Sequence, residues 1–264
     1  MATSPTSSGP AQPAEPAAET ARESSKANVP QTGPGVSLDL RAGHEDLTEK
    51  TYRVLRDLIV TRAIPPGGKV TAEGLSQRFG VSRTTVKGAL DQLASEGLVD
   101  VRPQVGTFVR GLTAKDVRAL WDVRLMLEVF AVRQGVPAAT DAQRAELRAT
   151  VDEMAPLVDR SEYREEGYEH SVALNRRLHG LVVETADNSY LVGIYRQLSA
   201  HFHIVDFRSR QGLRRADLGQ QEHRTIVEAY ERRDADLAAT TMARHIERSR
   251  DVVLQAMAKL GDVL

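Results

Sequence analysis

The alternation of apolar and polar residues between positions 46 and 112 predicts three helices followed by a pair of strands. Apolar side chains within 47–63 recur every three or four residues, which is the spacing of an amphipathic helix. The Pro-Pro-Gly-Gly run at 65–68 ends this helix, because proline and glycine favour a turn. Further helices are expected at 72–79 and from Ser82 to about residue 96, and strands at 98–102 and 106–110.

The third of these helices has defined ends and a defined inner face. Gly80 fits the left-handed cap at the end of the preceding helix, and Ser82 can cap the next helix with its hydroxyl. Val86, Leu90 and Leu93 fall on one side and are expected to pack inward. The opposite side of the first turns therefore carries Arg83, Thr84, Thr85 and Lys87.

From residue 113 onward the strand pattern disappears, and the apolar spacing is helical throughout. Helices are expected at about 113–135, 140–160, 161–186, 188–211, 216–233 and 235–260. Long helices joined by short connections pack most economically as an antiparallel bundle, here of six or seven helices. The sequence thus predicts a mainly α protein, with a winged helix-turn-helix at 46–112 and an all-α bundle at 113–264.

Composition separates residues 1–45 from the rest of the chain. Six of the eleven prolines fall there, among few large apolar residues, so a disordered tail is expected. No apolar run approaches the roughly 18 residues that cross a bilayer, and the N-terminus does not resemble a signal peptide. The absence of cysteine excludes disulfides, thiolate metal sites and cysteine nucleophiles. We therefore expect a soluble, cytoplasmic protein without a membrane partner.

The net charge of -1 hides an uneven distribution along the chain. Residues 46–112 carry ten Lys and Arg against seven Asp and Glu, and acids outnumber bases on both sides of this segment. Its order of helix, short helix, turn, helix and hairpin is that of a winged helix-turn-helix, whose last helix enters the major groove of DNA. Arg83 can then read guanine, and the threonines can meet thymine methyls or phosphates. An ordinary capped and solvated first turn is the alternative, which the element order and the basic charge disfavour.

Three of the seven histidines lie among apolar residues at helical spacing, so His179, His223 and His245 are expected to face the bundle interior. Burying three neutral imidazoles without partners is expensive, which favours a shared ligand. Asn175, one turn before His179, can add an oxygen on the same face. Three separately hydrogen-bonded core histidines are the open alternative. The other histidines have no particular placement: His44, His170, His201 and His203.

Residues 52–108 resemble the N-terminal DNA-binding domain of the GntR transcription regulators. The matching residues are Pro66-Gly67, the run LSQRFGVSRTTVKGAL at 75–90, Leu93, EGLV at 96–99 and GTFV at 106–109. The resemblance implies operator contacts by Ser82, Arg83, Thr84, Thr85, Lys87 and Gly106. Lys87 replaces the usual arginine and keeps the charge without the bidentate reach. Glu73 stands where FadR-type members have an arginine, so that contact is not carried over.

Residues 113–258 resemble the FCD effector domain of FadR-type GntR regulators. The markers are the RLMLE run at 124–128, the run from Asn175 to His179, Asn188, His223 and His245. Metal-binding members hold aspartate and three histidines at these positions. The resemblance therefore implies a divalent metal ion, zinc or nickel, with the ligands Asn175, His179, His223 and His245. Asparagine in place of aspartate removes one negative charge, which weakens metal binding and strengthens the attraction for an anionic effector. The three histidines also argue against a fatty-acyl-CoA ligand.

Arg124 has two interpretations. It can point into the bundle as a clamp for the carboxylate of an effector. It can instead form an ion pair with Glu128, four residues later on the same helix, and this interpretation is favoured.

These features predict a ligand-responsive, sequence-specific DNA-binding transcription regulator that acts as a repressor in the cytoplasm, on the nucleoid. A homodimer would bind a palindromic operator, since one half-site rarely gives enough specificity. A divalent metal ion and a small carboxylate or other anion would bind in the bundle and change the placement of the two DNA-binding domains. The alternative is a metal-dependent enzyme with a three-histidine site. An enzyme would need a general base near the metal, and the sequence has no acidic residue at a spacing such as H-E-x-x-H. An enzyme would also leave the winged helix unexplained.

Overall fold

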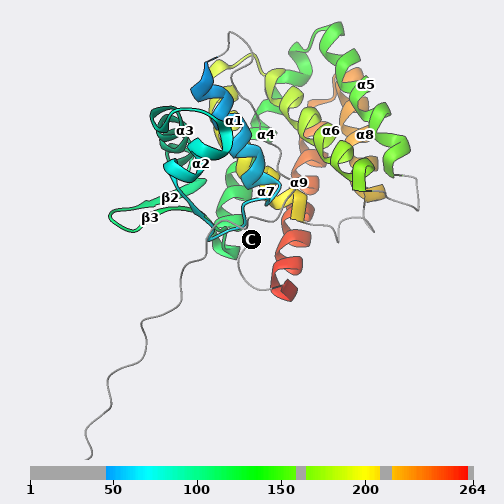
Figure 1. Ribbon diagram of the computed structural model, residues 1–264. Coiled ribbons are helices and arrows are strands. Elements are labelled where there is room, and N and C mark those ends of the chain that lie inside the picture. The colour runs from blue at the N-terminus through cyan, green and yellow to red at the C-terminus, as the bar shows by residue number, and fades with distance from the viewer. Residues whose placement is uncertain (1–45, 159–164, 209–215, 261–264) are drawn as a thin grey trace, which may run out of the picture.

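The computed structural model describes residues 46–158, 165–208 and 216–260, which form a small winged domain beside a larger helical bundle (Figure 1). The expected tail at 1–45 falls outside the described residues, so its disorder stays a prediction. The mainly α fold class is confirmed. The elements are α1 Leu47–Val60, β1 Lys69–Val70, α2 Ala72–Phe79, α3 Arg83–Ser95, β2 Val99–Arg102, β3 Gly106–Val109, α4 Ala114–Ala138, α5 Asp141–Val158, α6 Glu165–Glu184, α7 Ser189–Arg208, α8 Ala216–Arg232 and α9 Ala235–Leu260.

The helices of the winged domain pack around one apolar core. Thr71 and Ser82 cap α2 and α3, because each side chain accepts a hydrogen bond from a backbone N–H in the first turn. Gly80 ends α2 with a φ of 66°, the left-handed cap expected at this position. Val86 and Leu93 of α3, which were predicted to face inward, are fully buried. The first turn of α3 is thereby directed away from the core.

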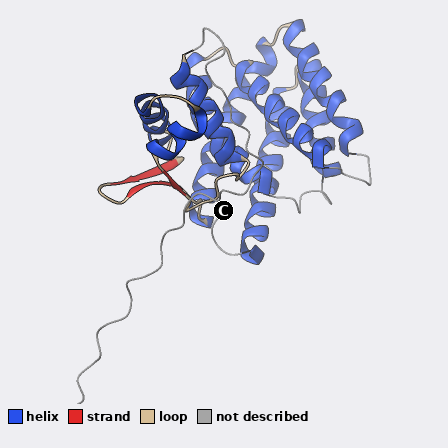
Figure 2. Ribbon diagram, in the orientation of Figure 1, coloured by secondary structure: helices blue, strands red, loops and turns tan. Residues whose placement is uncertain are grey.

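The strands of the winged domain form a small antiparallel sheet in the order β1-β3-β2. Figure 2 shows this sheet in red beside the helices of the domain. Strands β2 and β3 are the predicted hairpin, with Asp100 opposite Phe108 and Arg102 opposite Gly106. The sequence pattern does not predict β1, because two residues are too few to show an alternation. This strand places Lys69 opposite Phe108, so the chain that follows α1 is tied to the wing.

Helices α4 to α9 form the bundle, in which α4 packs along α9, α6 and α7. Thr113 and Asp116 form a capping box at the start of α4, each side chain accepting the backbone N–H of the other residue. This helix was expected to stop before Pro137, but it continues to Ala138. A proline in the last turn removes only one backbone hydrogen bond, so the helix tolerates it there. None of the helices in the described ranges is long and apolar enough to cross a membrane.

The winged domain and the bundle meet where α1 packs against α7. Arg56 of α1 donates a hydrogen bond to Oγ of Ser199 on α7, at 3.0 Å. His201, also on α7, is buried beside Gly97, which lies between α3 and β2. The sequence pattern assigns His201 no particular placement, because its neighbours across this junction come from distant parts of the chain. Helix α7 therefore contacts both domains.

Candidate functional site

The first turn of α3 presents the residues that were predicted to contact DNA. Arg83, Thr84 and Lys87 have exposed side chains. Oγ of Ser82 accepts a hydrogen bond from the backbone N–H of Thr85 at 3.0 Å, and the two hydroxyl oxygens lie 2.8 Å apart. Ser82 and Thr85 thus hold the end of the helix, while the other three side chains project outward. Their contacts with bases and phosphates stay predictions.

Arg83 forms an ion pair with the preceding helix. Its Nη2 atom lies 2.6 Å from Oε1 of Glu73, in the first turn of α2. The first turn of α3 contains no acidic residue of its own, and Glu73 compensates the positive charge of Arg83, which a helix N-terminus disfavours. The glutamate that replaces the expected arginine of α2 therefore pairs with the predicted base-reading residue.

The wing places two cations over one aromatic ring. Nζ of Lys69 lies 5.8 Å from the ring centroid of Phe108, and the guanidinium carbon of Arg102 lies 4.7 Å from it. Gly106 has a φ of 134°, a conformation that other residues rarely adopt, and an added Cβ would lie 2.7 Å from Cε of Lys69. The backbone conformation of the wing thus favours glycine at the position predicted to contact DNA, and Lys69 and Arg102 place two cations on the sheet.

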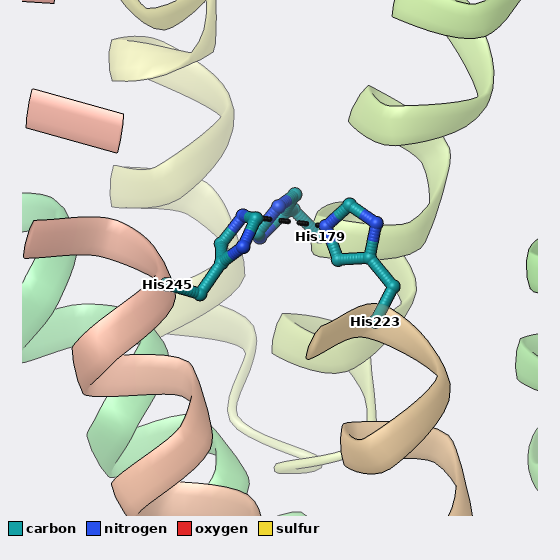
Figure 3. A group of neighbouring side chains, drawn as sticks. All are labelled: His179, His223 and His245. Atoms are coloured by element: carbon teal, nitrogen blue, oxygen red, sulfur yellow. Dashed lines mark hydrogen bonds between the residues drawn. The ribbon is translucent and has the colours of Figure 1, made fainter. Parts of the chain in front are cut away.

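Three histidines from three helices meet in the interior of the bundle (Figure 3). His179 comes from α6, His223 from α8 and His245 from α9, and one ring nitrogen of each lies within 4.8 Å of the others. His179 and His223 are buried, and the His245 side chain is 11% exposed. The apolar spacing predicted this inward orientation, and the three imidazoles lie together rather than in separate sites.

Two buried carboxylates orient two of these histidines. Oε2 of Glu128, on α4, lies 2.5 Å from Nδ1 of His179, and Oε2 of Glu222 lies 3.1 Å from Nδ1 of His245. Each Nδ1–H then donates to a carboxylate, and the Nε2 atoms are left for another partner. Nε2 of His223 lies 3.3 Å from Nε2 of His245. A carboxylate behind the imidazole is the arrangement that fixes the tautomer of metal-binding histidines and raises their basicity.

Burial favours the neutral form of all three imidazoles. Burial lowers the pKa of His179, although the negative charge of Glu128 acts to raise it. Burial also lowers the pKa of His245, although its hydrogen bond with Glu222 acts to raise it. The pKa of His223 falls well below its ordinary value, through burial and then through nearby positive charges. A neutral imidazole keeps a nitrogen lone pair, which is what a metal ion requires.

The three histidines fit a divalent metal ion. Nε2 of His179 is buried and has no hydrogen-bond partner among the described residues, which is costly for a nitrogen without a ligand. Two nitrogens bound to one tetrahedral ion at about 2.0–2.1 Å lie about 3.3 Å apart. The Nε2 atoms of His223 and His245 have this separation, 3.3 Å. Asn175, one turn before His179, is half-buried, and its role as a fourth ligand stays a prediction.

Arg124 is buried next to this cluster. Its Nε donates a hydrogen bond to Oε1 of Glu128 at 2.7 Å, so the predicted ion pair between the two residues is present. The guanidinium carbon lies 5.5 Å from the ring centroid of Trp121 and 5.2 Å from that of Phe202. Glu128 also accepts a hydrogen bond from the hydroxyl of Tyr195 on α7, at 3.1 Å. A direct contact between Arg124 and an effector stays a prediction.

Both domains of the chain match known families. The bacterial regulatory proteins of the gntR family match residues 47–109, and the FCD domain matches residues 119–248. The chain belongs to the GntR family of transcription regulators. Its FCD domain contains all three clustered histidines, and its GntR domain contains α1 to β3.

Relatives of this GntR regulator are similar over most of their length. It is 26% identical to the HTH-type transcriptional repressor RspR of Escherichia coli (strain K12) over 218 residues, which are 83% of this chain and 93% of that protein. It is 28% identical to the Nta operon transcriptional regulator of Aminobacter aminovorans over 193 residues, which are 72% and 86% of the two chains. The solved structure of E. coli McbR/YncC has a TM-score of 0.69 at 18% identity and covers 80% of this chain and 98% of that chain. At 18% identity, the similarity to this solved structure shows a shared fold alone.

The enzyme alternative receives no support from these comparisons, since the relatives are transcription regulators. The contacts around the histidines agree with this result. The carboxylates of Glu128 and Glu222 are engaged with Nδ1 atoms, on the side of each ring that faces away from the shared Nε2 region. Neither is therefore placed as a general base toward that region.

Sequence reasoning missed the residues that support the histidines and the recognition helix, α3. Glu222 directly precedes His223, and an acidic residue beside a predicted ligand was the available signal. Tyr195 carries no comparable signal. The family pattern marks Glu73 only as a departure, although an acid on α2 can reach the first turn of α3 across the helix-turn-helix. Lys69 lies in the strand that the sequence pattern does not predict.

Proposed function

We propose that this GntR regulator is a repressor whose bundle binds a divalent metal ion and a small anionic effector, and whose winged domain binds a palindromic operator as a homodimer. The observation that carries the proposal is the convergence of His179, His223 and His245 in a chain that also has a GntR-type DNA-binding domain. The name of RspR, a transcriptional repressor, supports repression as the response. With operator DNA as its partner, the protein acts on the nucleoid in the cytoplasm.

The proposed metal ligands are the three histidines and Asn175, all of which are neutral. Imidazole nitrogen with one amide oxygen suits zinc or nickel better than it suits magnesium or calcium. A bound divalent ion supplies a centre of positive charge and coordination positions for an anionic oxygen. Because no ligand in this set is negative, the full double charge remains to attract an anion.

A small carboxylate is the effector class that this charge distribution favours. The positive charge of Arg124 contributes to lowering the pKa of all three histidines, so its field acts at the cluster. Attraction between opposite charges is also stronger in the bundle interior than in water. Glu128 compensates the charge of Arg124 within a buried ion pair, so the attraction for an anion comes mainly from the metal ion.

Helix α7 is the proposed connection between the effector site and the winged domain. Tyr195 on α7 donates to Glu128, which also contacts His179. One turn further along α7, Ser199 accepts a hydrogen bond from Arg56 of the winged domain. An effector that repositions α7 would therefore move the winged domain, and would change DNA affinity only as far as it favours one arrangement over the other.

The homodimer has a candidate interface on α4. Met126 and Phe130 are 64% and 47% exposed, large values for such apolar side chains. They line a surface groove of about 430 Å³ with Leu125, Val129, Arg133 and Ala243. A second copy of the chain is the proposed occupant, because a palindromic operator requires two winged domains and a two-fold dimer uses the same patch on each subunit. Phe130→Asp should shift sedimentation from dimer to monomer, while Tyr190→Asp, at an 85% exposed position, should not. An unchanged dimer in the Phe130 variant would place the interface elsewhere.

The decisive experiment measures metal content and DNA binding together. Elemental analysis of the purified protein should find zinc or nickel, and gel shifts should show binding to the promoter of its own or an adjacent gene. Small carboxylates should weaken this binding in the metal-loaded protein. Absence of metal after dialysis against zinc and nickel, with stability unchanged when all three histidines are replaced, would favour separate core histidines. Absence of any gel shift on those promoters would count against local operator control.

A further inference from the structure

The exposed ion pair between Glu73 and Arg83 joins the first turns of α2 and α3, on the side where the winged domain is predicted to face DNA. Nη2 of Arg83 lies 2.6 Å from Oε1 of Glu73, and the two side chains are 66% and 62% exposed. Thr71 and Ser82 cap the two helices, so the turns that carry the pair are well defined. An exposed pair of this kind adds little to folding stability. We therefore consider how the pair affects the contacts that Arg83 can make with DNA.

The pair restricts how the Arg83 guanidinium can be used. Guanidinium has five N–H donors in a planar fork, and Glu73 accepts from one of its terminal nitrogens. This contact limits the rotation of a long side chain and leaves the remaining donors for another partner. Near DNA that partner is either a phosphate oxygen or a base edge, such as O6 and N7 of guanine.

Glu73 discriminates between these two partners. Its carboxylate compensates the charge of Arg83 and repels a phosphate on the same side, whereas guanine O6 and N7 are neutral acceptors. We propose that Glu73 is a specificity-determining residue of the DNA interface, which keeps Arg83 oriented toward a base edge and away from the phosphate backbone. The proposal rests on the assignment of Arg83 as a base reader. It predicts that Glu73 reduces affinity for DNA in general and increases selectivity for the operator.

The setting of Lys87 supports this division of roles. Lys87 lies one turn after Arg83 on the exposed side of α3. Among the described residues no carboxylate lies within ion-pair distance of Lys87, in contrast to Arg83. Arg83 and Lys87 thus lie on one face of α3, but only Arg83 has a carboxylate as its neighbour in the described part of the chain. The cation without one is suited to phosphate, and the cation paired with Glu73 is suited to a base.

The test compares Glu73→Gln with a matched variant elsewhere in the winged domain. Operator sequences are first selected from random duplex DNA with the wild-type protein, and each variant is titrated with the selected duplex and a scrambled one over a range of salt concentrations. Glu73→Gln should bind the scrambled duplex several-fold more tightly, with a salt slope steeper by about one. Its preference for the selected duplex should fall by on the order of tenfold. Glu49→Gln removes the same charge from an exposed ion pair with Arg53 on α1 and should change neither quantity.

The same titrations in an Arg83→Ala background separate the proposal from its rivals. Glu73→Gln should have no further effect on selectivity there, because the residue that it positions is gone. A further loss would mean that Glu73 contacts a base itself, and would overturn the proposed positioning role. Unchanged selectivity and salt slope in Glu73→Gln, with selectivity lost in Arg83→Ala, would overturn the role of Glu73 and leave Arg83 as a reader. Selectivity retained in Arg83→Ala would refute both assignments.

Discussion

Oε2 of Glu128 lies 2.5 Å from Nδ1 of His179, although 51 positions separate the two residues in the chain. Glu128 also binds Arg124 through Oε1. Burial opposes ionisation of this carboxyl, but the charge of Arg124 and the hydrogen bonds from His179 and Arg124 hold its pKa below its ordinary value. An ionised Glu128 can therefore accept the Nδ1–H of a neutral His179 and leave Nε2 as a metal ligand.

Replacement of Glu128 by glutamine is expected to weaken metal binding about 10–100-fold, the usual effect of losing such a partner. The amide keeps the size of the side chain but does not raise the basicity of His179. Calorimetric titration with zinc and with nickel measures the effect. Glu184→Gln, an exposed position on the same helix as His179, is the control and should bind metal as the wild type does. Equal affinity in the Glu128 variant would mean that His179 does not depend on this carboxylate.

The elements of both domains could be predicted because their signals are local. The caps at Ser82 and Gly80 and the inward faces of the helices are set by residues within a few positions of one another. The apolar spacing likewise predicted that His179, His223 and His245 face the interior. Strand β1 was missed, since it exists only through its pairing with β3.

The contacts that complete each site could not be predicted, because they join residues from different elements. Glu128 reaches His179, and Glu222 reaches His245, across the bundle. The helical spacing predicted Glu128 only as a partner of Arg124, four residues away. The position of His201 depends on the packing of α7 against the winged domain, and nothing near it in the sequence indicates that neighbour.

Arg83→Ala is expected to cost about 1–3 kcal/mol on the operator and to flatten the preference at one base pair. Lys87→Ala should weaken all sequences alike and reduce the salt slope by about one, because it removes a phosphate contact. Quantitative gel shifts with operator variants at several salt concentrations distinguish the two effects. If Arg83→Ala left the sequence preference untouched, the assignment of Arg83 as a base reader would be wrong.

Arg124→Met is expected to lower the free energy of unfolding by about 3–5 kcal/mol, because it leaves the fully buried Glu128 without its arginine partner. Urea denaturation measures this loss. Arg196→Met removes an exposed ion pair with Glu184 and should cost no more than about 1 kcal/mol. The double variant Arg124→Met, Glu128→Gln should recover part of the loss, since the buried charge is removed as well. Additive losses in the double variant would contradict this account.

Stability should fall in acid partly through Asp116, at the start of α4. Hydrogen bonds from the side chain and then the backbone of Thr113 lower the pKa of Asp116 below its ordinary value. A lowered pKa means that the carboxylate stabilises the fold at neutral pH, and that this contribution is lost as the pH falls below about 4. Asp116→Asn should therefore cost about 0.5–2 kcal/mol at pH 7, and less against wild type at pH 3. Urea denaturation at both values measures this difference. A gap that stays constant with pH would exclude the carboxylate as its source.

Asn175→Asp tests the proposed metal site as a chemical argument. A carboxylate oxygen is a stronger donor than an amide oxygen, so the variant should bind zinc or nickel more tightly than the wild type does. The same change lowers the net charge of the metal-loaded site by one, so affinity for a small carboxylate effector should fall even as metal occupancy rises. Replacement of His179, His223 or His245 should weaken metal binding by far more than Asn175→Asp strengthens it. Asn188→Asp makes the same substitution at the cap of α7, where Oδ1 already accepts backbone N–H groups, and should leave metal affinity unchanged. Equal metal affinity with asparagine and aspartate at 175 would mean that this side chain does not bind the ion and that water completes its coordination.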